Sequence, residues 1–153
     1  MSELTEAGKR EVCQQLERLL ADTYALYLKT QGFHWNVVGP GFPYLHELFG
    51  QQYEALSGPI DALAERIRAL GHTAPASFSQ LSKLTRVAEE AGAPAAEAML
   101  RQLVDGHEQC ARSAREVMLV AQSVDDEATA DMAIERIQEH DKAVWMLRVT
   151  LQR

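Results

Sequence analysis

The sequence has few of the features that mark secreted, membrane or nucleic-acid-binding proteins. Its two cysteines, Cys13 and Cys110, offer no disulfide framework, so we expect a cytoplasmic protein. No apolar run approaches the roughly 18 residues of a membrane span, and the N-terminus lacks the pattern of a signal peptide. Only four of its 15 cations are lysines, and they form no cluster or tail that could contact phosphates. We therefore expect no membrane association and no tight DNA binding.

The composition is that of an ordinary acidic globular protein. The 153 residues carry 15 basic and 22 acidic side chains, which gives a net charge of −7, and 46% of the residues are hydrophobic. This length predicts one domain, residues 1–153, large enough to bury a core without disulfide or metal staples. An acidic surface favours the passage of cations over the binding of anionic polymers.

Apolar residues recur at three- and four-residue steps and strand patterns are absent, which predicts an all-α protein. The expected helices are four long ones, over about 5–31, 43–70, 94–122 and 125–151, and a short one at Phe78–Leu84. The 23-residue stretch before the third long helix has two readings. In a four-helix bundle it is either a crossover that lets the second and third long helices run parallel, or a mobile loop.

Two histidines and an i, i+4 carboxylate pair are the candidate metal ligands. His34 and His46 flank the loop after the first helix, and Asp61 and Glu65 lie further along the second. Imidazole and carboxylate groups suit iron. Because 15 residues of helix separate His46 from Asp61 by roughly 22 Å, one metal cannot touch both on one chain. Either these groups are unrelated, or the helix pairs antiparallel with a second copy and the site spans a two-fold interface.

Other features of the sequence bear on whether these groups form a metal site between two chains. Di-iron bundles that hold their metals within one chain use Glu-x-x-His, and that motif is absent here. Six of the ten aromatic residues lie between Phe33 and Tyr53, where they could plug the bundle end or shield a redox centre, with Trp35 able to take an oxidising equivalent. His107 and His140 lie on apolar stripes and are interpreted as satisfied core or interface histidines. Proline inside the second helix, at Gly58-Pro59, predicts a kink.

Together, these segments resemble the Dps family of mini-ferritins. The likeness rests on Phe33-His34-Trp35-Asn36-Val37-Val38-Gly39-Pro40, Leu45-His46-Glu47-Leu48-Phe49, Asp61-x-x-x-Glu65 and Lys142-Ala143-Val144-Trp145-Met146-Leu147-Arg148. It implies a ferritin-like four-helix bundle with a short extra helix, assembled as a hollow homo-dodecamer. It also implies a ferroxidase centre, an oxidoreductase site for Fe²⁺/Fe³⁺, in which one subunit supplies His34 and His46 and another supplies Asp61 and Glu65. Family members oxidise ferrous iron, commonly with hydrogen peroxide, and store ferric mineral.

The chain departs from that family in three places, one of which is the Gly58-Pro59 pair inside the second helix. The family usually has an acidic ligand one turn after the second histidine, and here that position is Gly50. A second iron would lose a carboxylate, which leaves one or two irons per site open, and Glu47 or Glu54 could compensate. The lysine-rich terminal extension that often binds DNA is missing.

By matching position, Asp126, Glu127 and Asp131 would line a three-fold iron-entry pore. The alternative for these acids is only a favourable helix N-terminus.

Three functional hypotheses follow. The first is an iron-oxidising and iron-storing mini-ferritin that protects the cell against oxidative stress. The second is a nucleoid protein that protects DNA by binding it, with weak or vestigial ferroxidase activity. The third is a storage cage whose catalysis is poor because of Gly50. The sequence leaves open the preference between peroxide and oxygen and the occupancy by other metals such as Zn²⁺.

Overall fold

The computed structural model describes residues 3–152 and contains five α-helices. They are α1 (Glu6–Asn36), α2 (Phe42–Ala69), α3 (Phe78–Leu84), α4 (Ala96–Ser123) and α5 (Glu127–Leu151). The predicted all-α class is confirmed, with the short helix where it was expected. The first helix runs five residues further than predicted. Its apolar repeat fades after Tyr27, but Thr30 and Phe33 are buried and extend the packed face, so His34 lies within the last turn.

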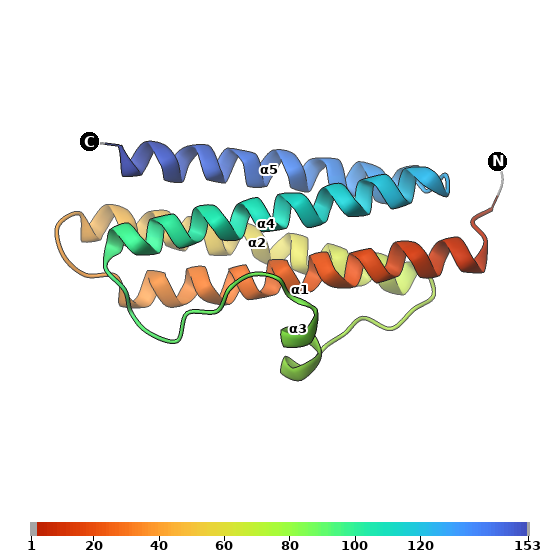
Figure 1. The fold of residues 1–153 in the computed structure, drawn as a ribbon, viewed down its shortest axis with the longest axis horizontal. Coiled ribbons are helices and arrows are strands. Elements are labelled where there is room, and N and C mark those ends of the chain that lie inside the picture. Colours follow the sequence, from red (N-terminus) through yellow and green to blue (C-terminus); the bar gives the residue numbers. More distant parts are fainter. Residues whose placement is uncertain (1–2, 153) are drawn as a thin grey trace.

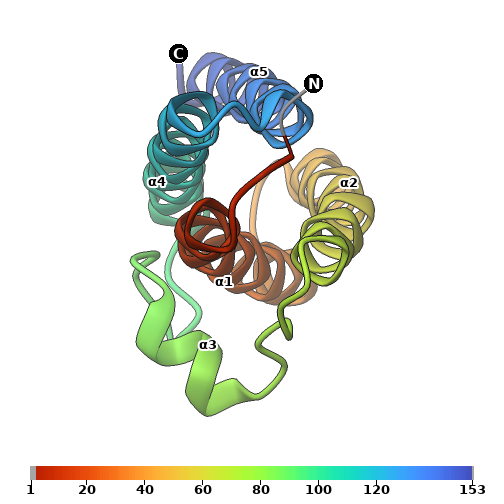
Figure 2. The ribbon, with the colours of Figure 1, turned by 90° about the vertical axis from the view of Figure 1, so that its right-hand side faces the viewer.

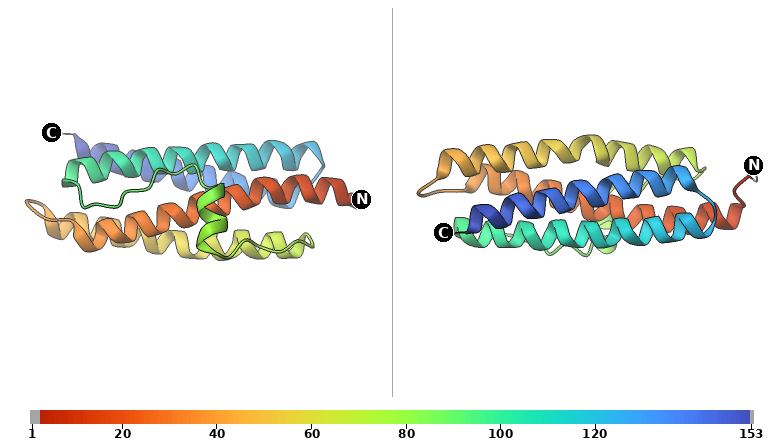
Figure 3. Two further views of the ribbon diagram at one scale, coloured as in Figure 1. Left: turned by 60° about the horizontal axis from the view of Figure 1, so that its bottom comes forward. Right: turned by 90° about the horizontal axis from the view of Figure 1, so that it is seen from above.

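The four long helices pack as two antiparallel hairpins, α1 with α2 and α4 with α5 (Figure 1). The connection between α2 and α4 returns along the length of the bundle, so α2 and α4 run in the same direction. Figures 2 and 3 show α3 lying outside the bundle across α1. Of the two readings of this connection, the crossover is therefore correct.

A buried carboxylate holds the crossover against the bundle. Asp22 of α1 accepts hydrogen bonds from the Thr85 hydroxyl (2.8 Å) and the Arg86 backbone N–H (2.6 Å) of the crossover. Its second oxygen accepts from the Ser113 hydroxyl of α4 at 2.5 Å. Asp22 is fully buried, so its carboxylate needs these three donors in place of water. The crossover is thus tied to two helices.

The bundle has an apolar cluster toward each end. Phe33 and Phe49 belong to the cluster near the α1–α2 loop, and Leu16 and Leu63 belong to the other. Helix α2 passes through Gly58-Pro59 without ending, so the kink at this pair stays a prediction. No helix within residues 3–152 is long and apolar enough to cross a membrane.

Candidate metal centre

The turn between α1 and α2 brings His34 and His46 into contact. His34 lies in the last turn of α1 and His46 near the start of α2. Gly39 (φ 99°) and Gly41 (φ 83°) adopt the left-handed backbone conformation that favours glycine, which allows the chain to reverse here. The two imidazole rings stack with centroids 3.8 Å apart and planes inclined by 13°.

Each histidine hydrogen-bonds to the backbone of the other. The His34 Nδ1 lies 2.5 Å from the His46 carbonyl oxygen, and the His46 Nδ1 lies 2.7 Å from the His34 carbonyl oxygen. A carbonyl only accepts, so each Nδ1 must carry a proton, and in the neutral ring each Nε2 keeps its lone pair. This is the arrangement found behind metal-binding histidines, where the second ring nitrogen donates to a carbonyl or carboxylate. The pair therefore fits a metal through its two Nε2 atoms.

Aromatic rings enclose the histidine pair, although Trp35 is not one of them. Phe42 stacks on His46 with centroids 5.1 Å apart, and Tyr53 meets His34 edge-on at 5.3 Å. Trp35 is 61% exposed and makes no ring contact within residues 3–152. Four residues separate Phe42 from His46 and seven separate His46 from Tyr53, so all three lie on one face of α2. The helical period could therefore have identified these neighbours.

Gly50 lies directly against the imidazole of His34. A Cβ atom at position 50 would lie 2.9 Å from the His34 Cε1 and 3.0 Å from its Nδ1. Contacts this short would force the ring to move. The ring thus occupies the space that a side chain at position 50 would need. Glycine at this position allows the His34 ring to lie where it does against His46.

Asp61 and Glu65 form a second, separate group on α2. Both are exposed, and the hydrogen bond and charge of Asp61 raise the pKa of Glu65. They lie 15 or more residues beyond His46 on the same continuous helix. Within residues 3–152 no three His, Cys, Asp or Glu side chains come together to hold a metal ion. One chain therefore presents a histidine half and a carboxylate half that do not meet.

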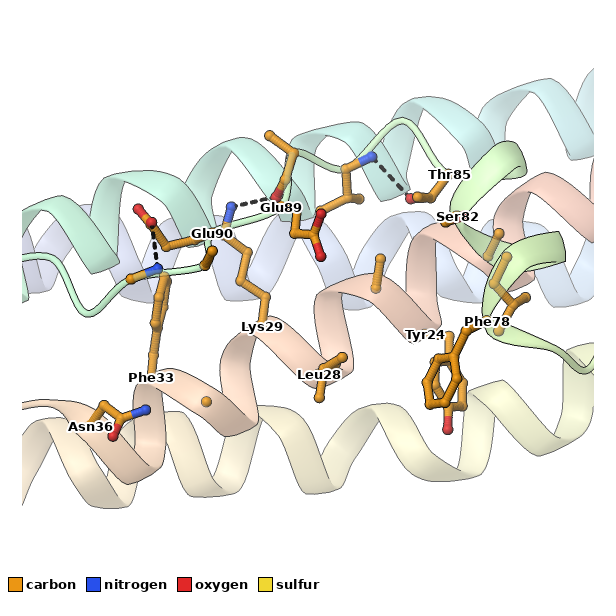
Figure 4. Close-up of a pocket in the computed structure, with 18 of the residues that line it drawn as sticks. Tyr24, Leu28, Lys29, Phe33, Asn36, Phe78, Ser82, Thr85, Glu89 and Glu90 are labelled. Carbon is orange, nitrogen blue, oxygen red and sulfur yellow. Dashed lines mark hydrogen bonds between the residues drawn. The ribbon is translucent and has the colours of Figure 1, made fainter.

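A groove and several exposed apolar side chains lie on the side of α1 that faces the crossover. The groove has a volume of about 540 Å³ and is lined by residues including Leu28, Phe33 and Phe78 (Figure 4). Lys29 spans part of it and donates to the Ala88 carbonyl at 2.7 Å. Leu28 is 50% and Phe78 is 79% exposed. Such an exposed apolar surface is typical of a protein–protein interface.

Comparison with known proteins identifies the family. Residues 13–153 match the family model of the ferritin-like domain. The crystal structure of a Dps protein from Vibrio cholerae covers 97% of this chain with 94% of its own length, at a TM-score of 0.94 and 32% identity. The chain belongs to the Dps family. The Vibrio protein is described as a member of a broad superfamily of ferritin-like diiron-carboxylate proteins.

Two sequence relatives of this Dps-family chain carry different names. The DNA protection during starvation protein of Brevibacillus brevis is 39% identical over 139 residues, 90% of this chain and 92% of that protein. A Nostoc protein described as low temperature-induced and uncharacterized is 40% identical over 147 residues, 95% of this chain and 82% of that protein. Both alignments span nearly the whole chain.

The acidic residues proposed for an iron-entry pore differ in their surroundings. Asp126 is only 3% exposed and accepts a hydrogen bond from the Arg66 guanidinium at 3.0 Å. It also caps α5 by accepting from the backbone N–H of Thr129 at 3.1 Å. Glu127 and Asp131 are exposed. Asp126 therefore pairs with Arg66 and caps α5, and the pore role of Asp126, Glu127 and Asp131 stays a prediction.

The two carboxylates considered as replacements for a ligand at position 50 are also exposed. Glu47 and Glu54 lie on the surface of α2, and Glu47 accepts a hydrogen bond from the Gln51 amide at 3.4 Å. Their compensating role stays a prediction.

Proposed function

We propose that this Dps-family protein is a mini-ferritin that oxidises ferrous iron at sites shared between two subunits. The observation that carries the proposal is the reciprocal hydrogen bonding of His34 and His46, which leaves both Nε2 atoms ready to bind a metal. The carboxylates of Asp61 and Glu65 from a second chain would complete the oxygen and nitrogen ligand set. Two chains related by a two-fold axis would form two identical sites.

The exposed apolar surface supports this pairing of chains. Leu28 and Phe78 line the groove beside α1, and Trp35, Val38 and Tyr44 are exposed close to the histidine pair. A second copy covering these side chains would remove apolar area from water. It would also exclude water from the iron site, where Trp35 is the proposed acceptor of an oxidising equivalent.

Iron is the substrate in this scheme. Two ferrous ions would each give one electron to hydrogen peroxide, and two protons would complete its conversion to two water molecules. The histidines would hold the ion through neutral nitrogen atoms, and the carboxylates would balance the charge of the ferric product. We further propose that peroxide is preferred to oxygen and that a dodecameric shell stores the ferric mineral in the cytoplasm.

The test is anaerobic titration of metal-free protein with ferrous iron, followed by stopped-flow absorbance after addition of peroxide or air. Fast ferric formation that saturates at one or two ions per shared site, and that is faster with peroxide, would support the proposal. His46→Gln should abolish the fast phase, whereas the control His72→Gln, which changes a half-buried histidine outside both candidate ligand groups, should keep it. Oxidation no faster than in buffer would overturn it. Competition by Zn²⁺ in the same titration measures the metal preference of the site.

DNA protection is the second candidate function, because relatives such as the Brevibacillus brevis protein carry that name. This chain has a net charge of −7, and residues 1–12 hold three glutamates against Lys9 and Arg10. We therefore propose that any protection of DNA comes from removing ferrous iron and peroxide, with little direct binding. A gel-shift complex that persists at about 0.15 M salt would contradict this proposal. A protein with few cations at its surface releases few counterions from DNA, so its binding should be weak at that salt concentration.

A further inference from the structure

A buried polar cluster inside the bundle is left unexplained by the iron chemistry. Gln52 of α2, His107 of α4, and Arg136 and His140 of α5 are each at most 8% exposed. Five of their polar atoms have no hydrogen-bond partner within the described chain: Gln52 Nε2 and Oε1, Arg136 Nε, and the Nε2 atoms of both histidines. Buried polar atoms without partners are rare in native proteins.

These four side chains line one cavity. It has a volume of about 260 Å³ and lies between α2 and α5, the neighbouring long helices with the sparsest mutual packing. Glu139 and Lys142 also line it, and both are exposed. A water molecule takes about 30 Å³ of liquid volume, so the space can hold several waters or a small polar ion. The cluster therefore faces a cavity that solutes can enter.

The histidine pair argues against a metal ion in this cavity. His107 Nδ1 and His140 Nδ1 lie 2.9 Å apart, so in the neutral pair one donates a hydrogen bond and the other accepts it. The ring that accepts must carry its proton on Nε2, which leaves only one Nε2 lone pair for a metal. Burial and the charge of Arg136 lower the pKa of His107 to about 3, and burial lowers that of His140 strongly as well.

Arg136 supplies a positive charge that lacks a partner. Its guanidinium forms no ion pair within residues 3–152. Burial lowers its pKa, and the charges of Glu139 and Glu135 only partly offset that effect. A buried charge is stable only when it is paired or hydrogen-bonded. An anion in the cavity would supply the missing partner.

We propose that this cavity binds a small inorganic oxyanion of the sulfate or phosphate class, and that binding takes up one proton. Arg136 Nε and the Gln52 amide donate to the anion. A proton added to the histidine pair keeps the Nδ1–Nδ1 hydrogen bond and turns both Nε2 atoms into donors. All partners of the anion then donate.

The charges around the cavity determine how the affinity for the anion changes with pH. Arg136 and Lys142 attract the anion, whereas Glu139 and Glu135 oppose it. The Cys110 thiol stays neutral because burial raises its pKa well above the ordinary value. The anion raises the pKa of the histidine pair by pairing with its positive charge. Its affinity should therefore fall as pH rises, by up to about tenfold per unit, the limit for one linked proton.

Sulfate is the probe for the test, because it does not titrate between pH 5.5 and 8. Calorimetric titration of the metal-free full chain, in buffers of different ionisation enthalpy, measures affinity and proton uptake together. We expect saturation at one sulfate per chain with close to one proton taken up. Arg136→Gln should weaken binding at least tenfold. The matched control is Arg148→Gln, which removes an exposed α5 arginine that pairs with Glu108, and it should leave binding unchanged.

A second measurement uses the unmutated protein. In NMR spectra of histidine-labelled chain, sulfate should shift the ring carbon resonances of His107 and His140 toward their protonated positions and leave His72 in place. Unshifted His107 and His140 resonances, equal affinity in Arg136→Gln, or binding without proton uptake would each overturn the proposal. None of these readouts involves iron, so the result is independent of the proposed ferroxidase activity.

Discussion

The close approach of Gly50 to His34 links one glycine to the geometry of the proposed iron site. A carboxylate at this position would match the usual family pattern, but its Cβ would lie 2.9 Å from the His34 ring. An acidic side chain at position 50 would therefore add one candidate metal ligand but displace another, His34. The chain has a glycine where the stacked histidine pair requires one.

We predict that Gly50→Asp slows iron oxidation. Displacing His34 breaks its hydrogen bond to the His46 carbonyl, and loss of such a supporting bond typically costs 10–100-fold in metal affinity or activity. The overpacking should also lower the free energy of unfolding by about 1–3 kcal/mol. Stopped-flow oxidation and chemical denaturation measure the two effects. Ser57→Asp, which adds an acid to an exposed position of α2, is the control. A faster Gly50→Asp protein would show that the missing carboxylate limits catalysis.

The carboxylate pair should show its coupling in a pH titration. Asp61 raises the pKa of Glu65, so in the metal-free protein Glu65 should keep its proton to higher pH than an isolated glutamate. The charged form of Glu65 is disfavoured in the folded state. The folding stability that protonated Glu65 contributes below its ordinary pKa is therefore lost as pH rises through the raised pKa. Asp61→Asn should bring the pKa of Glu65 back toward its ordinary value. Carboxyl-carbon NMR measures both, and an unchanged Glu65 titration in the variant would contradict the coupling.

At the scale of elements, the crossover depends on Asp22. Asp22→Ala would leave the Thr85 and Ser113 hydroxyls and the Arg86 N–H without this acceptor. A buried unsatisfied group such as the Ser113 hydroxyl costs about 1–3 kcal/mol. We expect a loss of at least 2 kcal/mol by chemical denaturation. Hydrogen exchange at residues 85–87 should also accelerate. The exposed Asp141→Ala is the control, and equal stability of the two variants would show that the crossover is held by other contacts.

The helices could be predicted from the sequence, but several contacts between them could not. Helical periodicity predicted the four long helices, because the apolar repeat is a local property of each segment. It could not reveal the contact between Asp126 and Arg66, which lie sixty positions apart in the sequence. It also described His107 and His140 as satisfied, and the structure confirms their burial but leaves both Nε2 atoms without partners. The stacking of His34 on His46 depends on loop geometry that the histidine spacing alone does not specify.

For the assembled molecule, iron entry should depend on exposed acids. We predict that Glu127→Gln combined with Asp131→Asn slows iron uptake several-fold, because a negative pore concentrates cations and raises their rate of entry. Its denaturation midpoint should stay close to that of the unchanged protein. Asp126→Asn should instead destabilise the protein by about 1 kcal/mol through the weakened Arg66 contact, because asparagine caps a helix about as well as aspartate. Normal uptake in the double variant would remove these acids from the entry route.

The central claim is that each iron site takes its histidines from one chain and its carboxylates from another. It is tested most directly by mixing two inactive proteins, His46→Gln and Asp61→Asn, under conditions where subunits exchange. A mixed pair of chains contains one site with both halves intact. Random mixing makes half of the pairs mixed, so about a quarter of the normal oxidation rate should return. Restoration to that level would support the account. Rates that stay at the level of the separate variants, with subunit exchange verified by mass, would contradict it.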